Sequence, residues 1–186
     1  SDNKTTKYGG GVYCELAEGV SQNNCQVYFN GGTISGNESQ EGSGGGISVY
    51  GLKVQCASNA SGITITGNKA LKYYGGGIHL EKGASFTMNS GTVTDNSSEN
   101  YGGGVFVRDS EMIQNGGVIS NNTSNVGGGG VYIRGQDASA SYSASSGTIS
   151  GNTAELSGGG IYMSKNSTAT ISGGEIYGNT ANTQDG

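Results

Sequence analysis

The chain has 186 residues, a formal net charge of −5 and a sequence pI near 4.7. Only nine lysines and arginines are present, which argues against nucleic-acid binding, and no run of about 20 apolar residues predicts a membrane span. The 38 glycines occur without proline and without a three-residue period, which excludes collagen.

Two short motifs alternate along the chain, and each occurs six times. The first is a glycine triplet followed by an aliphatic residue, and the triplets begin at Gly9, Gly44, Gly75, Gly102, Gly128 and Gly158. The second is aliphatic-x-x-Asn, which ends at Asn37, Asn68, Asn96, Asn122, Asn152 and Asn179. Successive asparagines are 31, 28, 26, 30 and 27 residues apart. Internal repeats of this length predict one solenoid domain over residues 1–186.

A first strand is expected directly after each glycine triplet. In Val105, Phe106 and Val107 the outer residues are aliphatic, and the other copies share this alternation. A period of two predicts a short β-strand whose outer positions face a core and whose middle position faces solvent. The six middle residues are Tyr13, Ser48, His79, Phe106, Tyr132 and Tyr162.

A second strand is expected ahead of each asparagine, and a third at the aliphatic residue of the tetrad, as in Thr64, Ile65 and Thr66. The inward pairs of the second strand are Val27/Phe29, Ser58/Ala60, Phe86/Met88, Met112/Gln114, Tyr142/Ala144 and Ala169/Ile171. A helical reading fails because glycine and β-branched residues dominate. The sequence therefore predicts an all-β, right-handed parallel β-helix of about six coils of 26–31 residues, with three short strands per coil.

The recurring asparagine occupies the same place in every coil, so the six copies are expected to stack. A side-chain amide has both donors and acceptors and can bond the amide above and the one below. We therefore predict an inward-facing structural ladder at one corner, made of Asn37, Asn68, Asn96, Asn122, Asn152 and Asn179.

With these motifs, the chain resembles the passenger domains of chlamydial polymorphic outer membrane proteins and, more broadly, bacterial surface proteins with right-handed parallel β-helix repeats. That family alternates Gly-Gly-Ala-aliphatic with Phe-x-x-Asn, and residues 151–162 are the most similar stretch here. The resemblance implies an exported bacterial adhesin or surface stalk at the cell surface or outside the cell. Polar residues at both ends predict a piece of a longer exported protein.

The middle residues of the first strand form the strongest candidate for a binding face. Stacked in successive coils, they would give an aromatic stripe that binds sugar rings or a partner protein. The alternatives are ladder packing that stabilises the sheet, or cover from a neighbouring loop. The candidate ligand-binding residues are Tyr13, His79, Phe106, Tyr132 and Tyr162, with Tyr73, Tyr74 and Tyr101 at the edge.

Two other surface features invite a binding interpretation. Hydroxyl residues flank the tetrad strand in a regular array that could order water or ice, although Glu175 and Tyr177 break it in the sixth copy. Threonine is also simply a good exposed strand residue. The long segments 15–24 and 134–142 are expected to be loops that carry binding, tolerated insertions or, for the first, an end cap.

Catalysis has little support, and we predict a non-enzymatic protein without cofactor or metal. The aspartates are scattered, and His79 is the only histidine and has no obvious nucleophile beside it. Asp109 and Glu111, near Arg108, are interpreted as solvated charges at a corner. Neither a calcium-binding nonapeptide repeat nor a phosphate loop is present.

The three cysteines leave the disulfide pairing open. Cys25 and Cys56 each lie twelve residues before an asparagine and would stack in neighbouring coils. Cys14 and Cys25 flank the first long loop and could pin it instead. A third alternative is no disulfide, with buried cysteine acting as a small apolar residue.

Together these features predict a surface adhesin or stalk module that displays an aromatic face to host glycan or surface protein. A purely structural spacer is the first alternative, and a carbohydrate-active enzyme is the second. Uncapped strand edges at the two ends would also permit end-to-end self-association.

Overall fold

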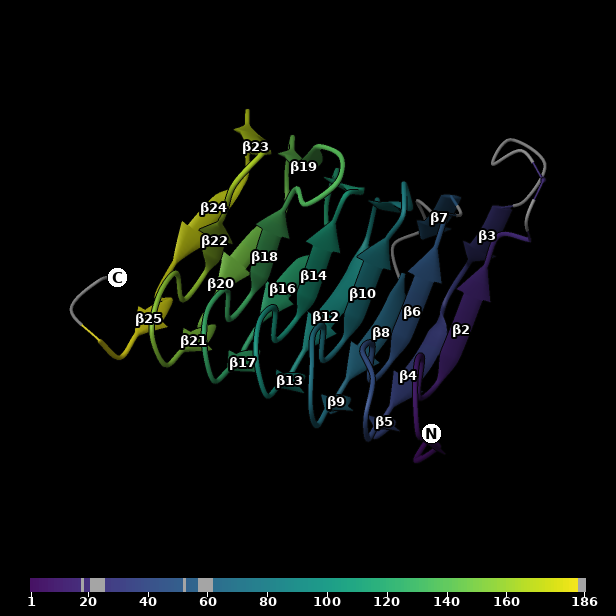
Figure 1. The fold of residues 1–186 in the computed structure, drawn as a ribbon. Coiled ribbons are helices and arrows are strands. Elements are labelled where there is room, and N and C mark those ends of the chain that lie inside the picture. The colour runs from purple at the N-terminus through teal and green to yellow at the C-terminus, as the bar shows by residue number, and fades with distance from the viewer. Residues whose placement is uncertain (18, 21–25, 52, 57–61, 184–186) are drawn as a thin grey trace.

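The computed structural model describes residues 1–186 except 18, 21–25, 52, 57–61 and 184–186. The chain winds as a right-handed parallel β-helix, with the two termini at opposite ends of the array (Figure 1). Every strand pair is parallel, and each strand pairs with its counterpart in the next coil. The predicted fold class is confirmed. Within the described ranges there is no helix that could cross a membrane.

Sheet 1 follows the glycine triplets and sheet 2 follows sheet 1 in every coil. Sheet 1 contains β2 (Val12–Glu15), β6 (Ile47–Tyr50), β10 (Ile78–Glu81), β14 (Val105–Arg108), β18 (Val131–Arg134) and β22 (Ile161–Met163). Sheet 2 contains β3 (Gln26–Phe29), β7 (Lys53–Cys56), β11 (Ser85–Met88), β15 (Glu111–Gln114), β19 (Ala140–Ala144) and β23 (Ser167–Ile171).

Sheet 3 carries the aliphatic residue of each tetrad, and sheet 4 follows the asparagines. Sheet 3 contains β4 (Gly32–Ser35), β8 (Ile63–Thr66), β12 (Gly91–Thr94), β16 (Val118–Ser120), β20 (Thr148–Ser150) and β24 (Glu175–Tyr177). Sheet 4 contains β1 (Lys4–Thr5), β5 (Glu38–Ser39), β9 (Lys69–Ala70), β13 (Ser97–Ser98), β17 (Thr123–Ser124), β21 (Thr153–Ala154) and β25 (Thr180–Ala181). Sheet 4 is additional to the three predicted strands, because two residues are too few to show alternation.

The core runs along the axis of the solenoid and is built from the inward positions of all the sheets. Val105, Val107, Met112 and Ile119 are fully buried and belong to one apolar cluster with the corresponding residues of the other coils. Stacking like residues on like is what lets a chain with so few large apolar residues bury a continuous core. In the last coil, inward Met163 stays 41% exposed because a neighbouring coil covers it on one side only.

The second strand of the second coil lies earlier than the sequence suggested. The structure places it at Lys53–Cys56, with Val54 opposite Val27 and Phe86. The predicted inward pair Ser58/Ala60 lies outside the described residues, and its assignment as the strand of this coil was wrong. The prediction assumed a constant distance from the asparagine, whereas the connection between β7 and β8 is longer in this coil.

Each position of the glycine triplet has its own steric reason, as Gly102, Gly103 and Gly104 show. Gly102 has φ +68°, a left-handed conformation that favours glycine. A β-carbon on Gly103 would lie 2.4 Å from the Thr123 carbonyl oxygen of the next coil. A β-carbon on Gly104 would lie 2.9 Å from the Nδ2 atom of Asn122. The triplet and the asparagine are therefore parts of one packed corner.

The asparagine ladder is confirmed, and it has one more member than predicted. The Asn96 Oδ1 atom accepts from the backbone N–H of Asn68 at 3.0 Å and from its Nδ2 at 2.9 Å. The Asn96 Nδ2 atom donates to Asn122 Oδ1 at 3.0 Å and to the Ile65 carbonyl at 2.9 Å. Asn3 joins the end of the ladder by donating to Asn37 Oδ1. The sequence missed Asn3 because no tetrad motif precedes it.

Candidate functional site

The outer surface of sheet 1 is largely covered, contrary to the prediction of an exposed aromatic face. His79, Phe106 and Tyr132 are at most 3% exposed, so the expectation that they face solvent was wrong. Tyr13 at one end is 43% exposed, and Tyr162 at the other end is half-buried. The central residues of the predicted stripe therefore cannot contact a ligand directly.

Tyrosines from the loops that precede the triplets provide the cover. Tyr74 stacks on Phe106 with ring centroids 4.4 Å apart, and Tyr101 lies 4.4 Å from Tyr132. Beneath them, His79, Phe106 and Tyr132 stack in register with centroids 5.5 and 5.2 Å apart. Such pairs add to stability beyond the area they bury. The structure shows both alternatives proposed for this face, ladder packing along the sheet and cover from a neighbouring loop.

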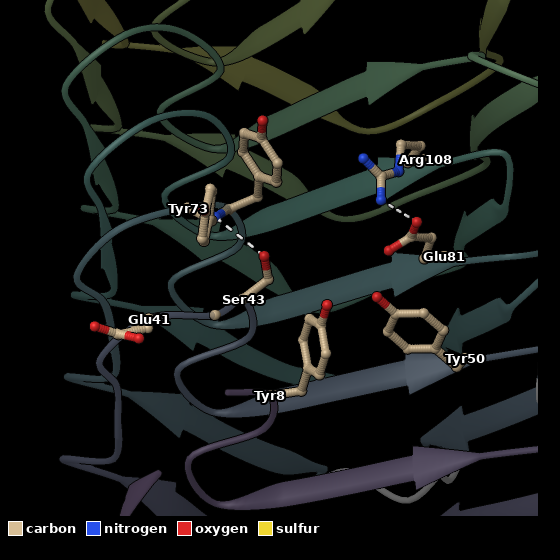
Figure 2. Close-up of a pocket in the computed structure, with 9 residues that line it drawn as sticks. Tyr8, Glu41, Ser43, Tyr50, Tyr73, Glu81 and Arg108 are labelled. Carbon is tan, nitrogen blue, oxygen red and sulfur yellow. Dashed lines mark hydrogen bonds and ion pairs between the residues drawn. The ribbon is translucent and has the colours of Figure 1, made fainter. Parts of the chain in front are cut away.

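A cavity of about 230 Å³ opens beside this covered stripe (Figure 2). We call it the tyrosine cavity. One wall comes from loops that precede the triplets of the first three coils, and the other from the ends of β6, β10 and β14. Its lining residues are Tyr8, Glu41, Gly42, Ser43, Tyr50, Tyr73, Tyr74, Glu81 and Arg108.

The polar end of the tyrosine cavity is an ion pair between neighbouring coils. Arg108 Nη2 donates to Glu81 Oε1, and the Glu81 side chain is only 10% exposed. The other oxygen, Glu81 Oε2, is buried and lies 3.6 Å from His79 Nε2. In Figure 2 it points away from Arg108 toward the hydroxyl of Tyr50, which forms a hydrogen bond with Glu81. Both oxygens of this carboxylate therefore face protein groups.

Tyr50 lies next to this acceptor and is kept as a neutral phenol. Burial, followed by the neighbouring Glu81 and Tyr8 side chains, raises the pKa of Tyr50. Its hydroxyl therefore remains a hydrogen-bond donor throughout the physiological pH range. The cavity thus offers phenol hydroxyls, an ion pair and aromatic ring faces.

Glu81, Arg108 and Tyr50 were not predicted from the sequence as site residues. They occupy the fourth position after their glycine triplets, so aligning the repeats would have stacked them. In such an alignment, one coil has glutamate and the next has arginine at the same repeat position. This pattern predicts an ion pair between neighbouring coils.

His79 connects the ion pair to a buried serine. Ser48 Oγ lies 3.2 Å from His79 Nδ1, and His79 Nε2 lies 3.6 Å from Glu81 Oε2. The order serine, histidine, carboxylate is the order of a hydrolytic triad. Ser48 has no exposed surface, however, so a substrate would not reach its hydroxyl. The group is a structural polar cluster beneath the tyrosines.

The acid stability of the protein should depend on His79. Burial, and then the Arg108 charge, lower the pKa of His79 to about 3. Below about pH 6.5 the unfolded chain binds a proton that the native chain excludes, so the free energy of unfolding should fall as the pH falls from about 6.5 toward 3. Urea unfolding between pH 7 and pH 4 measures this slope. The His79→Phe variant should lack this part of the slope, because phenylalanine fits the aromatic stack and does not titrate.

NMR gives an independent check on this prediction, because the chain has one histidine. The imidazole resonances of the native protein should stay unchanged from pH 7 to about pH 4. A native-state titration near pH 6.5 would contradict the burial argument.

Asp109 and the hydroxyl array of sheet 3 were also singled out from the sequence. Asp109 is not a solvated corner charge, because its Oδ1 accepts from the backbone N–H groups of Gln136, Asp137 and Ala138. It therefore organises the second long loop. The hydroxyl array of sheet 3 is in register between coils, as Thr64 and Thr92 show, and is half-buried.

The disulfide predictions remain untested. Cys25 and the Cys56 side chain lie outside the described residues, and Cys14 is half-buried. The strand register places Phe29 opposite Cys56, so the expected stacking of Cys25 on Cys56 does not follow the observed pairing.

The fold and the stacked corner motifs define a right-handed parallel β-helix repeat protein. A family model described as periplasmic copper-binding protein (NosD) matches residues 1–184, and the chain belongs to this family. Searches of curated proteins and of solved structures returned no match. The family description is of periplasmic proteins and supports the expectation of an exported repeat protein. None of these comparisons shows the narrower similarity to chlamydial passenger domains.

The described residues do not fit a copper site. Copper in proteins prefers thiolate, thioether and imidazole ligands. Met88 and Met112 are buried in the core, and no group of three or more His, Cys, Asp or Glu residues gathers in the described part of the chain. His79 Nε2 is unpartnered, but the neighbouring Arg108 charge opposes a cation there.

Proposed function

We propose that the chain is a non-enzymatic binding module of an exported protein and that it holds a neutral saccharide in the tyrosine cavity. The observation that carries the proposal is a cavity lined by four tyrosines beside the Glu81–Arg108 ion pair. This combination matches the two sides of a sugar. The ring C–H face packs on an aromatic face, and the hydroxyls form hydrogen bonds with phenol and charged side chains.

The charges around the cavity favour a neutral ligand. Glu81 and Arg108 neutralise each other, which leaves Glu41 at the exposed edge as the remaining charge of the lining. An anionic ligand would meet the Glu81 carboxylate, and a cationic ligand would meet Arg108. A neutral molecule with several hydroxyls avoids both repulsions.

We propose that the cavity binds its ligand and does not catalyse a reaction. Of its two carboxylates, Glu81 is held in an ion pair with Arg108, and Glu41 is exposed at the opposite wall. We place the module outside the cytoplasmic membrane, on the cell surface or in the periplasm, with a host glycan as the partner. A rigid spacer is the second candidate function, and the burial of the central aromatic stripe favours it.

A glycan array with three forms of the protein tests the proposal. Wild type should bind one class of neutral glycan, and Tyr73→Ala should weaken that binding at least about tenfold, or about 1.4 kcal/mol. Tyr73 lines the cavity and is 40% exposed, so its removal should leave folding nearly unchanged.

Tyr177→Ala is the matched control, because Tyr177 is 58% exposed and lies on β24 in the last coil, away from the cavity. It should bind as wild type does. If all three forms bound equally well, the glycan would bind outside the tyrosine cavity, and the proposed site would be wrong. Absence of binding by folded wild type would favour the spacer.

A further inference from the structure

A second hollow lies on the other side of Tyr50. It measures about 450 Å³ and is lined mainly by the residues that follow β2, together with the turns after β6 and β10. We call it the Leu16 cavity. Its lining residues are Glu15, Leu16, Ala17, Gly19, Val20, Tyr50, Gly51 and Lys82.

Tyr50 is the common wall of the two cavities. It ends β6, its own side chain is buried, and its residue lines both hollows. On the side of the Leu16 cavity, Lys82 Nζ lies 5.4 Å from the Tyr50 ring centroid. Tyr50 ends β6, so the residue that follows this strand, Gly51, leads into the Leu16 cavity.

We propose that the two cavities are consecutive subsites for one linear, neutral oligosaccharide that crosses the ends of β6 and β10. This inference rests on the proposed saccharide binding in the tyrosine cavity and adds the length and direction of the ligand. Residues 15–17, 19 and 20, which belong to the first long segment singled out by the sequence, thereby acquire a role as a wall of the second subsite.

Cavity size is compatible with a ligand that occupies both hollows. Binding pockets commonly measure roughly 300–1,000 Å³. The tyrosine cavity falls below this range, the Leu16 cavity falls within it, and so do the two cavities together.

The chemistry of the Leu16 cavity suits a sugar with several hydroxyls. Leu16 and Val20 provide apolar surface, while Glu15 and Lys82 provide one acceptor and one donor of opposite charge. This lining again favours a neutral molecule. A polymer with identical sugars would find aromatic or apolar contact and a polar partner in each subsite.

Calorimetric titration against chain length tests the inference. The probes are linear oligosaccharides of glucose, xylose, mannose and N-acetylglucosamine, each from one to six sugars. For the series that binds, wild-type affinity should rise at least about tenfold from one sugar to three and then level off. The Lys82→Asn variant should bind the single sugar within about twofold of wild type and lose most of the gain with length.

Lys82→Asn is chosen because Lys82 has φ +58°, a conformation that asparagine tolerates. Lys165→Asn removes an exposed charge in the last coil and should behave as wild type. Equal affinity for one sugar and for six would overturn the two-subsite inference and leave the proposed function intact. If no length of any series binds, the proposed function itself fails, and the inference fails with it.

Discussion

Gly103→Ala should lower the free energy of unfolding by about 3 kcal/mol or more. The new β-carbon would lie 2.4 Å from the Thr123 carbonyl oxygen and 2.6 Å from that of Gly129. Both are backbone atoms of the next coil, and they cannot move without lengthening the hydrogen bonds between coils. Urea unfolding followed by circular dichroism measures the loss.

Gly67→Asn is the matched control, because Gly67 has a positive φ but makes no close contact with a neighbouring coil. Gly67 has φ +64°, but a β-carbon there would meet nothing closer than 3.8 Å. The corresponding residue two coils later is Asn121 with φ +54°, so asparagine fits this position. The control should cost at most about 1 kcal/mol. If the two variants lost equal stability, close coil contact would not be the reason for the second glycine.

Asn96→Ala should also destabilise the protein by about 3 kcal/mol or more. The substitution removes the acceptor of the buried Asn68 N–H and the donor to the Ile65 carbonyl. Each buried group left without a partner costs about 1–3 kcal/mol. Hydrogen exchange should show the largest loss of protection at Asn68, because its amide loses its partner directly.

Asn115→Ala provides the comparison within the same coil region. Asn115 is exposed and donates to Asn89 Oδ1 at 3.0 Å, so water can replace the lost bond. Its removal should cost less than about 1 kcal/mol. If the two variants lost equal free energy of unfolding, burial of the ladder asparagines would not be the reason for their contribution to stability.

The repeat pattern was sufficient to predict the architecture because each coil uses the same corner. The Gly103 and Asn96 positions are fixed by contacts with neighbouring coils, and such contacts leave a periodic mark in the sequence. Variation in connection length leaves no such mark. For this reason β7 was misplaced and the two-residue strands of sheet 4 were missed.

The candidate site was harder to predict than the fold because it depends on which loop covers which strand. Alternation correctly showed that Phe106 points out of the core, but it does not show that Tyr74 lies over it. Likewise, Glu81 and Arg108 are 27 residues apart and become partners only through the coil register. Local sequence patterns indicate whether a side chain points toward or away from the core. Whether that side chain is exposed to solvent depends on which loops pack over it.

A crystal structure of the protein with the saccharide that binds in solution tests the central claim most directly. One sugar ring is expected between Tyr8, Tyr50 and Tyr73, next to the Glu81–Arg108 ion pair. A saccharide on any other surface, with the tyrosine cavity filled only by water, would contradict it.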